Sequence, residues 1–288
     1  MAAKPHTWKS LPRTLHTAAT GMSSPRTPAP WRDAFLSHIT SMPQPTFVLS
    51  TLHHSPSGIV TPRARTCIYR GLWASLPPNE RNTAPRNPPV YQSDLPILTT
   101  DARMEKAGEV DATPEGSGGG GPVEAVWWAE GHGTQWRVRG TAWVLGPDVE
   151  GESEGAKAAR EALRARMWKC GDEDGEPWSW RREVTGQFGN LSPMMRGGFR
   201  NPPPGRPVAL PVAGEGIGLG QEVEDLEDRV ARENFRVVVI VPDEVDQVDL
   251  SDMKAPKRWL YVYRGASYKS TQPGGEVIGE WEKVEVWP

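Results

Sequence analysis

The sequence predicts a mostly β fold, an antiparallel barrel with helices at its periphery. Short apolar runs with strand-like alternation recur along the chain, and few stretches carry a long helical period. Most of the 13 tryptophans fall within these runs, where large aromatic side chains fill the core of a β-rich fold. We prefer this role to a platform that stacks nucleic-acid bases. With 30 glycines and 29 prolines among 288 residues, the chain should also carry long irregular insertions.

The strand segments are runs of β-branched and aromatic residues bounded by turn residues. Segments 46–52 and 60–69 flank a turn at 53–58 and predict a hairpin; segments 123–129 and 135–145 predict a second one. In 135–145 an apolar face alternates with a polar one, so one face should meet the core and the other solvent or a ligand. The predicted strands are 46–52, 60–69, 95–100, 123–129, 135–145, 235–242, 259–263 and 277–287.

Helical spacing of apolar residues predicts four short helices, over 32–39, 103–109, 155–168 and 223–232. Thr100 or Asp101 should cap the second of them. The arginines of the third (Arg160, Arg164 and Arg166) are interpreted as a solvated face. Segment 181–205 shows no period and is predicted to be irregular.

One domain is predicted over 29–288, with insertions near 74–94, 110–122, 147–177 and 205–222. Residues 1–28 form an arm with basic residues, no acid and several helix-breaking prolines. A disordered arm in a cytoplasmic protein is expected. The alternatives are a mitochondrial targeting segment or a true start at Met22.

Bulk composition excludes several function classes. A net charge of -3 provides no basic field for nucleic acid or an anionic membrane surface. No apolar run approaches the roughly 20 residues of a membrane span. The 2 cysteines lie far apart, which suits a reducing compartment without disulfides, and the 6 histidines lack metal-ligand spacing. We therefore expect no metal site.

The glycine-rich run 213–220 does not fit a dinucleotide-binding loop. Leu219 stands where the GxGxxG spacing needs glycine, and Pro207 and Pro211 interrupt the strand that should precede it. We interpret this run as a mobile loop.

A phosphate site is predicted where two strand ends meet a helix start. Segments 65–71 and 99–106 place Arg65, Thr100, Arg103 and Lys106 at such ends. A phosphate dianion is typically bound by two or three cations together with hydroxyl or N–H donors. Charge-assisted hydrogen bonds of this kind are about twice as strong as neutral ones. The alternative is a solvated set of charges beside a capped helix.

Segments 65–71, 99–106 and 134–140 resemble the FMN-binding split-barrel proteins related to pyridoxamine 5'-phosphate oxidase. Supporting matches are Pro30-Trp31-Arg32, Pro204-Gly205 and the C-terminal run 284–288. With gaps at the insertions, the resemblance covers about residues 29–288.

The resemblance implies a six-stranded antiparallel split barrel that forms a homodimer, with FMN in the cleft between two subunits. It implies that Arg65 and Lys106 bind the FMN phosphate, that Arg103 is a further cation, and that Gln135 bonds the flavin. Arg70 stands at the closing basic position of the first strand. The full predicted cofactor-binding set is Arg65, Thr66, Cys67, Ile68, Arg70, Thr99, Thr100, Arg103, Lys106 and Gln135.

The sequence departs from the family pattern on the substrate side. Met104 stands where many relatives have serine, which removes one phosphate donor. The Arg-x-His triplet of the true oxidases has Arg258-Trp259-Leu260 as its nearest match, without histidine, so Arg258 is the substrate-side candidate. The substrate-phosphate residues are not recognisable in 181–200, although Arg182, Ser192, Arg196 and Arg200 could serve.

The predicted function is an FMN-binding oxidoreductase that takes a small-molecule substrate. If oxidase activity is retained, the substrate is pyridoxamine or pyridoxine 5'-phosphate and the acceptor is oxygen. No catalytic residue is nominated, because the flavin carries the redox step. The alternatives are an FMN-binding protein without catalysis and an all-β interaction module without a cofactor.

Overall fold

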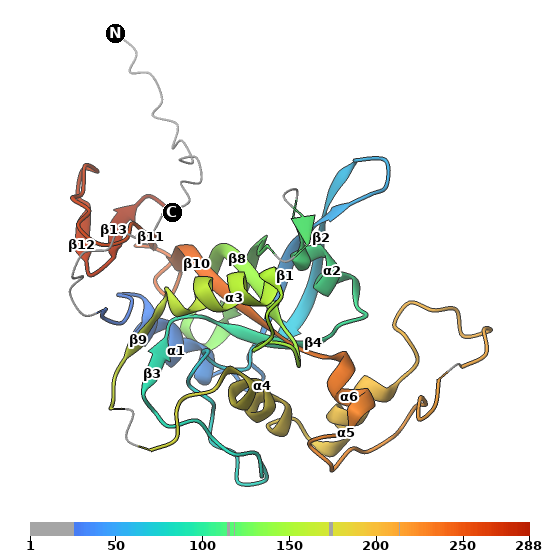
Figure 1. Ribbon diagram of the computed structural model, residues 1–288. Helices are drawn as coiled ribbons and strands as arrows, with labels where there is room; N and C mark the ends of the chain where they lie inside the picture. The colour runs from blue at the N-terminus through green and yellow to red at the C-terminus, as the bar shows by residue number, and fades with distance from the viewer. Residues whose placement is uncertain (1–25, 114–115, 118, 173–174, 213) are drawn as a thin grey trace.

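The computed structural model describes residues 26–113, 116–117, 119–172, 175–212 and 214–288 (Figure 1). The predicted arm at 1–28 therefore lies outside the described residues except for its last three.

The fold is built on one large antiparallel sheet, as the alternating segments predicted. Its spatial order is β12-β13-β11-β10-β8-β7-β1-β2, and β4 pairs with β10 beside this path. Two pairs of short strands lie apart from it, β3 (Tyr91–Ser93) with β9 (Met167–Lys169) and β5 (Ala112–Thr113) with β6 (Gly116–Ser117). The strands of the large sheet are β1 (Thr46–His54), β2 (Val60–Ile68), β4 (Ile97–Asp101), β7 (Gly121–Ala129), β8 (Thr134–Leu145), β10 (Phe235–Asp249), β11 (Lys257–Tyr263), β12 (Glu276–Ile278) and β13 (Trp281–Val286).

Six strands of this sheet, in the order β4-β10-β8-β7-β1-β2, close on themselves. The closure is made where the Arg70 amide donates to the Ile97 carbonyl and the Ile97 amide donates to the Gly71 carbonyl, both at 3.0 Å. The sheet has nine strands rather than the six predicted, because β11, β12 and β13 extend it beyond β10.

Strand β10 pairs with two different strands along one of its edges. Its first half pairs with β4 and its second half with β11, while β8 runs along the other edge. The register shifts between Pro242 and Glu244, where proline supplies no amide for the ladder. This irregularity lies between the β4 and β11 pairings and separates the closed barrel from the C-terminal strands.

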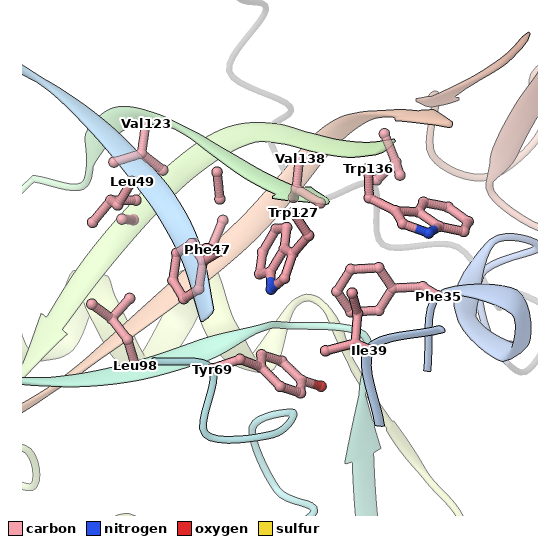
Figure 2. Close-up of a cluster of buried hydrophobic side chains, with 14 of the residues drawn as sticks. Phe35, Ile39, Phe47, Leu49, Tyr69, Leu98, Val123, Trp127, Trp136 and Val138 are labelled. Carbon is pink, nitrogen blue, oxygen red and sulfur yellow. The ribbon is translucent and has the colours of Figure 1, made fainter. Parts of the chain in front are cut away.

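The first core fills the barrel under helix α1 (Arg32–Thr40), as Figure 2 shows. The Phe35 ring makes edge-on contacts with Trp127, Trp136 and Tyr69 at centroid distances of 5.2, 5.6 and 6.0 Å. Such pairs add about 0.5–1.5 kcal/mol each beyond the area they bury. Trp127 and Trp136 are therefore core residues, in agreement with the predicted role, whereas Trp128 and Trp287 are exposed.

The second core lies on the other side of β10 and explains the apolar run of that strand. Val238 and Ile240 belong to the barrel core, whereas Phe235, Val237 and Val239 belong to the second core. A strand buried on both faces has no polar positions, so it appears in the sequence as a continuous apolar run.

Six α-helices lie within the described residues, and four of them begin at a side-chain cap. Ser153, Ser179, Ser192 and Asp228 each accept an amide of the first turn. Helices α4, α5 and α6 gather on one side of the molecule in Figure 1. The helices after α1 are α2 (Glu105–Asp111), α3 (Glu154–Arg164), α4 (Trp180–Gly189), α5 (Pro193–Gly197) and α6 (Arg229–Asn234), with a 3-10 turn η2 (Gly198–Arg200) after α5.

Two sequence predictions were wrong in this region. Segment 181–205, predicted to be irregular, contains α4, α5 and η2. Arg164 is exposed as predicted, with its guanidinium carbon 4.2 Å from the Tyr91 ring centroid, but Arg166 is largely covered and lies 3.5 Å from the Tyr263 ring centroid. A cation over an aromatic face is attracted by the ring quadrupole, so these residues fasten α3 and β9 to the rest of the fold.

Candidate functional site

Barrel closure brings the two predicted phosphate segments together. The hydrogen bonds between Arg70, Gly71 and Ile97 place the end of β2 beside the start of β4. Gly71 has a φ of 109°, a left-handed value that glycine adopts without strain. The ends of β2 and β4 and the start of α2 thus form one side of a cavity of about 940 Å³. That volume lies at the top of the roughly 300–1,000 Å³ range of small-molecule sites.

We call this side of the cavity the strand-end side. Eight of the ten predicted cofactor-binding residues line it, although they come from two segments some thirty residues apart. They are Thr66, Cys67, Ile68, Arg70, Thr99, Thr100, Arg103 and Lys106, and Asp101 and Met104 lie among them.

The opposite side, which we call the apolar wall, comes from residues 191–219. It includes Leu191 just after α4, Met195 of α5, residues of η2 and the proline-rich loop that follows. Sequence analysis placed these residues in an irregular segment and a mobile loop and missed the wall. The available signal was a set of bulky apolar residues in a segment without secondary-structure period. Among the wall residues are Leu191, Met195, Phe199, Val208, Leu210 and Leu219.

Two of the predicted phosphate cations are engaged in internal ion pairs. Arg65 donates to Glu109 at 2.8 Å and does not line the cavity. Arg103 lines the cavity, but its guanidinium donates to both carboxylate oxygens of Asp101, at 2.9 and 2.6 Å. The sequence could not show this, because it does not show which carboxylate the fold brings to each arginine.

Lys106 and Arg70 have no carboxylate partner among the described residues. The Lys106 ammonium lies 2.8 Å from the Met104 sulfur, and that sulfur also accepts the Thr100 hydroxyl at 3.6 Å. Burial lowers the pKa of Lys106, and the charge of Arg65 adds to this lowering against the opposing effect of nearby acidic groups. Lys106 is therefore a half-buried cation without an ion pair beside a hydroxyl.

Arg70 lies against the apolar wall. Its side chain reaches the Met195 sulfur at 3.9 Å, and its Nε is buried with no hydrogen-bond partner in the protein. Burial lowers the pKa of Arg70, with no charged neighbour contributing to the shift. Most buried donors in proteins have a partner, so this nitrogen is an unsatisfied donor that the surrounding side chains cover.

Cys67 belongs to the barrel core and also lines the strand-end side of the cavity. It is buried, and burial raises its pKa despite the opposing charges of Lys106 and Arg65. A thiol with a raised pKa is a weak nucleophile.

Two predicted residues lie away from this cavity. Gln135 is on β8, opposite Trp128 of β7 and Val248 of β10, and it does not line the cavity. Arg258, the substrate-side candidate, donates to both oxygens of Asp246 at 3.0 and 2.9 Å.

Arg137 also binds Asp246, so this buried carboxylate joins β8, β10 and β11 through two arginines.

The described residues place no group of three or more His, Cys, Asp or Glu side chains around a common point suited to a metal ion. In the same part of the chain, no helix has the length and apolar character to cross a bilayer.

The donor set of the strand-end side suits a phosphate-bearing cofactor. The Lys106 ammonium without an ion pair, the Arg70 guanidinium and three threonines (Thr66, Thr99 and Thr100) offer positive charge and hydroxyl donors. The facing wall offers apolar contact area. A phosphate and a flat ring system joined in one molecule fit this combination.

Comparison with known proteins finds similarity over part of the chain. Residues 28–146 match the family model of the FMN-binding domain of pyridoxamine 5'-phosphate oxidase. An uncharacterized protein of Saccharomyces cerevisiae is 26% identical over 120 residues, which span 41% of this chain and 37% of the yeast protein.

The fold has a counterpart among solved structures. A pyridoxamine 5'-phosphate oxidase-related, FMN-binding protein from Nostoc punctiforme is similar with a TM-score of 0.55 and 20% sequence identity. The similarity covers 91% of this chain and 100% of that one. The predicted family resemblance and the mostly β fold class are confirmed.

Proposed function

We propose that this chain, whose residues 28–146 match the FMN-binding domain of pyridoxamine 5'-phosphate oxidase, binds FMN in the described cavity and acts as a flavoprotein oxidoreductase. The observation that carries the proposal is Lys106, a half-buried cation without a carboxylate partner at the point where β2, β4 and α2 meet. A lysine in this position can pair with an anionic group of a ligand, because no carboxylate among the described residues occupies it.

In this proposal Lys106 and the hydroxyls of Thr66 and Thr100 hold the phosphate. Arg103 contributes less than the sequence suggested, because Asp101 already neutralises it. When bound, FMN supplies hydride transfer, and the protein supplies position, charge and a dry apolar surface.

Flavin retention tests this assignment. The protein should be yellow when purified, and Lys106→Ala should weaken FMN binding about tenfold or more, as expected for a lost charge-assisted hydrogen bond. Its unfolding temperature without flavin should not change, because Lys106 makes no ion pair. Lys254→Ala, at an exposed lysine away from the cavity, is the matched control.

A colourless protein whose unfolding temperature does not rise with FMN would contradict the proposal. The expected stabilisation is about 2.7 kcal/mol at a hundredfold excess of ligand over its dissociation constant.

A homodimer would complete the site, since Gln135 does not reach the cavity of its own chain. The registers Trp128↔Gln135, Val48↔Val126 and Val48↔Thr66 place these residues on one face of the sheet, the face that also carries Ile68. On this face Val48, Ile68 and Trp128 are exposed by 41%, 44% and 48%. A second copy that covers this face would bury them and bring its own Gln135 toward the cofactor.

Sedimentation equilibrium of the wild type and of Trp128→Glu tests the assembly. The wild type should sediment as a dimer and the variant as a folded monomer, because the new charge would be buried at the interface. A monomeric wild type that retains FMN would refute this part of the proposal.

The second candidate function is FMN binding without catalysis. It is favoured by the ion pair of Arg258 with Asp246, which already gives the candidate substrate arginine a carboxylate partner within the protein. The two functions differ in turnover. Reduction of the bound flavin by a substrate, followed by reoxidation in air, would support the oxidoreductase, whereas a flavin that no substrate reduces would support the carrier.

A further inference from the structure

We propose that Met104 is a redox modification site that controls ligand binding at the strand-end side. Hydrogen peroxide converts the Met104 thioether to a sulfoxide, and the new oxygen binds Lys106 and Thr100 in the position meant for the ligand's phosphate. The inference concerns the regulation of the site described above and rests on the proposed function.

The Met104 sulfur lies between two groups that are proposed to hold the phosphate. It accepts the Lys106 ammonium at 2.8 Å and the Thr100 hydroxyl at 3.6 Å. A thioether sulfur is only a weak acceptor. In the empty site, Met104 therefore receives two hydrogen bonds that an anionic oxygen would accept more strongly, and a phosphate can displace it.

The backbone of Met104 is fixed, so its sulfur can leave this position only by rotation of the side chain. The Met104 amide donates to the Asp101 carbonyl at 3.1 Å, and the Met104 carbonyl accepts the Ala107 amide at 3.0 Å. Methionine is unbranched and has three rotatable bonds, which makes such a rotation easy. The thioether thus covers the site while it is empty and withdraws when a ligand enters.

The Met104 side chain is accessible to a small oxidant. It is 39% exposed and lines the cavity. Hydrogen peroxide transfers one oxygen atom to the sulfur: the O–O bond breaks, an S–O bond forms, and water leaves. The sulfur is oxidised by two electrons and the peroxide is reduced by two, which yields methionine sulfoxide.

Oxidation replaces a weak acceptor by a strong one at the same place. The sulfoxide is polar, and its oxygen carries partial negative charge. Its hydrogen bond with the Lys106 ammonium is charge-assisted and so about twice as strong as a neutral one. A phosphate then has to displace this oxygen before it reaches Lys106, and its affinity falls.

Other sulfur-bearing side chains of the described residues are placed differently. Met194, Met195 and Met253 are exposed as well, but Met194 and Met253 do not line the cavity. Met195 lines it from the apolar wall, where its sulfur lies 3.9 Å from the Arg70 side chain. Cys67 lines the cavity but is buried. These residues provide the controls.

Peroxide treatment of the full-length protein, dialysed free of flavin, tests the proposal. After peroxide is removed, dithiothreitol restores reversibly oxidised cysteines, and FMN and inorganic phosphate are titrated by calorimetry. Both ligands should bind about tenfold or more weakly than before, as expected when a charge-assisted hydrogen bond must be displaced. Peptide mass spectrometry should locate a sulfoxide at Met104. Unchanged affinities in protein with oxidised Met104 would overturn the proposal.

Enzymatic repair supplies the reverse experiment. Two methionine sulfoxide reductases, one for each sulfoxide epimer, return the thioether. The affinity for both ligands should recover in step with the loss of sulfoxide at Met104. A weakened affinity that persists after Met104 has been repaired would show that another oxidised residue is responsible.

Met104→Leu removes the oxidisable sulfur and nearly keeps the side-chain volume. Its affinity for FMN should be the same before and after peroxide. Met195→Leu and Met253→Leu are matched controls, and peroxide should weaken their FMN binding as it does in the wild type. If Met104→Leu remains sensitive to peroxide, or if Met195→Leu becomes insensitive, the proposal is wrong.

Met104→Gln imitates the oxidised state, because its amide oxygen is an acceptor on a side chain of similar length. Without any peroxide it should bind FMN about tenfold more weakly than Met104→Leu. Adding Lys106→Ala to both variants should remove most of this difference, because the acceptor acts through that ammonium. A difference of the same size without Lys106 would contradict the proposed contact.

Failure here and failure of the proposed function have different signatures. A protein that binds no FMN, but whose affinity for inorganic phosphate falls with oxidation of Met104, would refute the flavoprotein and keep the modification site. A yellow protein whose FMN and phosphate affinities do not depend on the oxidation of Met104 would keep the flavoprotein and refute the modification site.

Discussion

Arg103 binds both carboxylate oxygens of Asp101, two residues earlier in the chain, and the same guanidinium reaches across the cavity to the apolar wall. Its terminal nitrogens donate to the carbonyls of Phe199 at 3.2 Å and Asn201 at 3.0 Å. Arg103 is therefore a link between the strand-end side and the wall. The sequence suggested a free phosphate cation at this position.

Arg103→Ala should destabilise the protein by about 1–3 kcal/mol, because it leaves the nearly buried Asp101 carboxylate without its ion pair. The wall should also become accessible to protease between residues 199 and 222. Arg103→Lys should restore little, since an ammonium cannot reproduce the bidentate geometry. Chemical denaturation and limited proteolysis measure both effects. An unchanged midpoint for the alanine variant would contradict the linking role.

The pair formed by Arg65 and Glu109 should make stability depend on pH. Burial acts to raise the pKa of Glu109, but hydrogen bonds from Thr51 and Arg65 outweigh it and lower the pKa below its usual value of 4.5. A lowered pKa means that this carboxylate stabilises the fold above its unfolded-state pKa. The contribution is lost as the pH falls through the folded-state value.

Arg65→Ala should therefore cost about 1–3 kcal/mol at pH 7, and the difference from the wild type should shrink as the pH falls below about 4.5. Urea unfolding of both proteins across this range measures it. Arg63→Ala, at an exposed arginine on the same strand, is the control and should show no such trend. A difference that stays constant with pH would mean that Glu109 is not the group responsible.

Gly197 permits a close approach that holds the wall in place. A Cβ built at this position would overlap the carbonyl oxygen of Gln221, whereas one built at Gly198 would meet nothing nearer than Asn201 at 4.0 Å. Gly197→Ala should lower stability by about 1–3 kcal/mol through overpacking, and Gly198→Ala should be close to neutral. Thermal unfolding of the two variants compares them. Equal effects would show that the Gln221 contact does not constrain the fold.

Cys67 should resist alkylation even though it lines the cavity. Burial raises the pKa of its thiol, so at neutral pH little thiolate is present, and the exposed Cys170 should react first with iodoacetamide. Labelling of Cys67 should begin only as the pH rises toward that raised pKa. Peptide mass spectrometry on the wild type and on Cys170→Ser identifies the modified residue. Equal labelling of both cysteines at pH 7 would refute this prediction.

The sequence predicted the elements whose pattern is local. The β1–β2 and β7–β8 hairpins follow from alternation within each strand, and the structure places both as expected. Helix α4 was missed because burial surrounds it on nearly every side: Glu183, Thr185 and Gln187 are buried together with Phe188. A helix with polar residues on its buried faces shows no amphipathic period.

The predicted site was correct in its segments and incomplete in its pairings. The convergence of 66–70 with 99–106 followed from the strand ends, and eight of the predicted residues meet there. Which cations have partners depended on residues distant in sequence, since Glu109 lies 44 residues from Arg65. The apolar wall depended on a loop without periodicity, for which local sequence provides no placement.

The bond from the Val223 amide to the Pro193 carbonyl, at 3.0 Å, ties together the two ends of the segment that forms most of the wall. This segment also lies outside residues 28–146, which contain the whole strand-end side. In the proposed function, the side that would hold the cofactor and the apolar wall that faces it therefore come from separate stretches of the chain. Residues 194–222 could be replaced as one segment, provided that the replacement preserves the positions of the Phe199 and Asn201 carbonyls, which accept hydrogen bonds from Arg103. Such an exchange would change the apolar wall and leave the proposed cofactor-binding residues of the strand-end side unchanged.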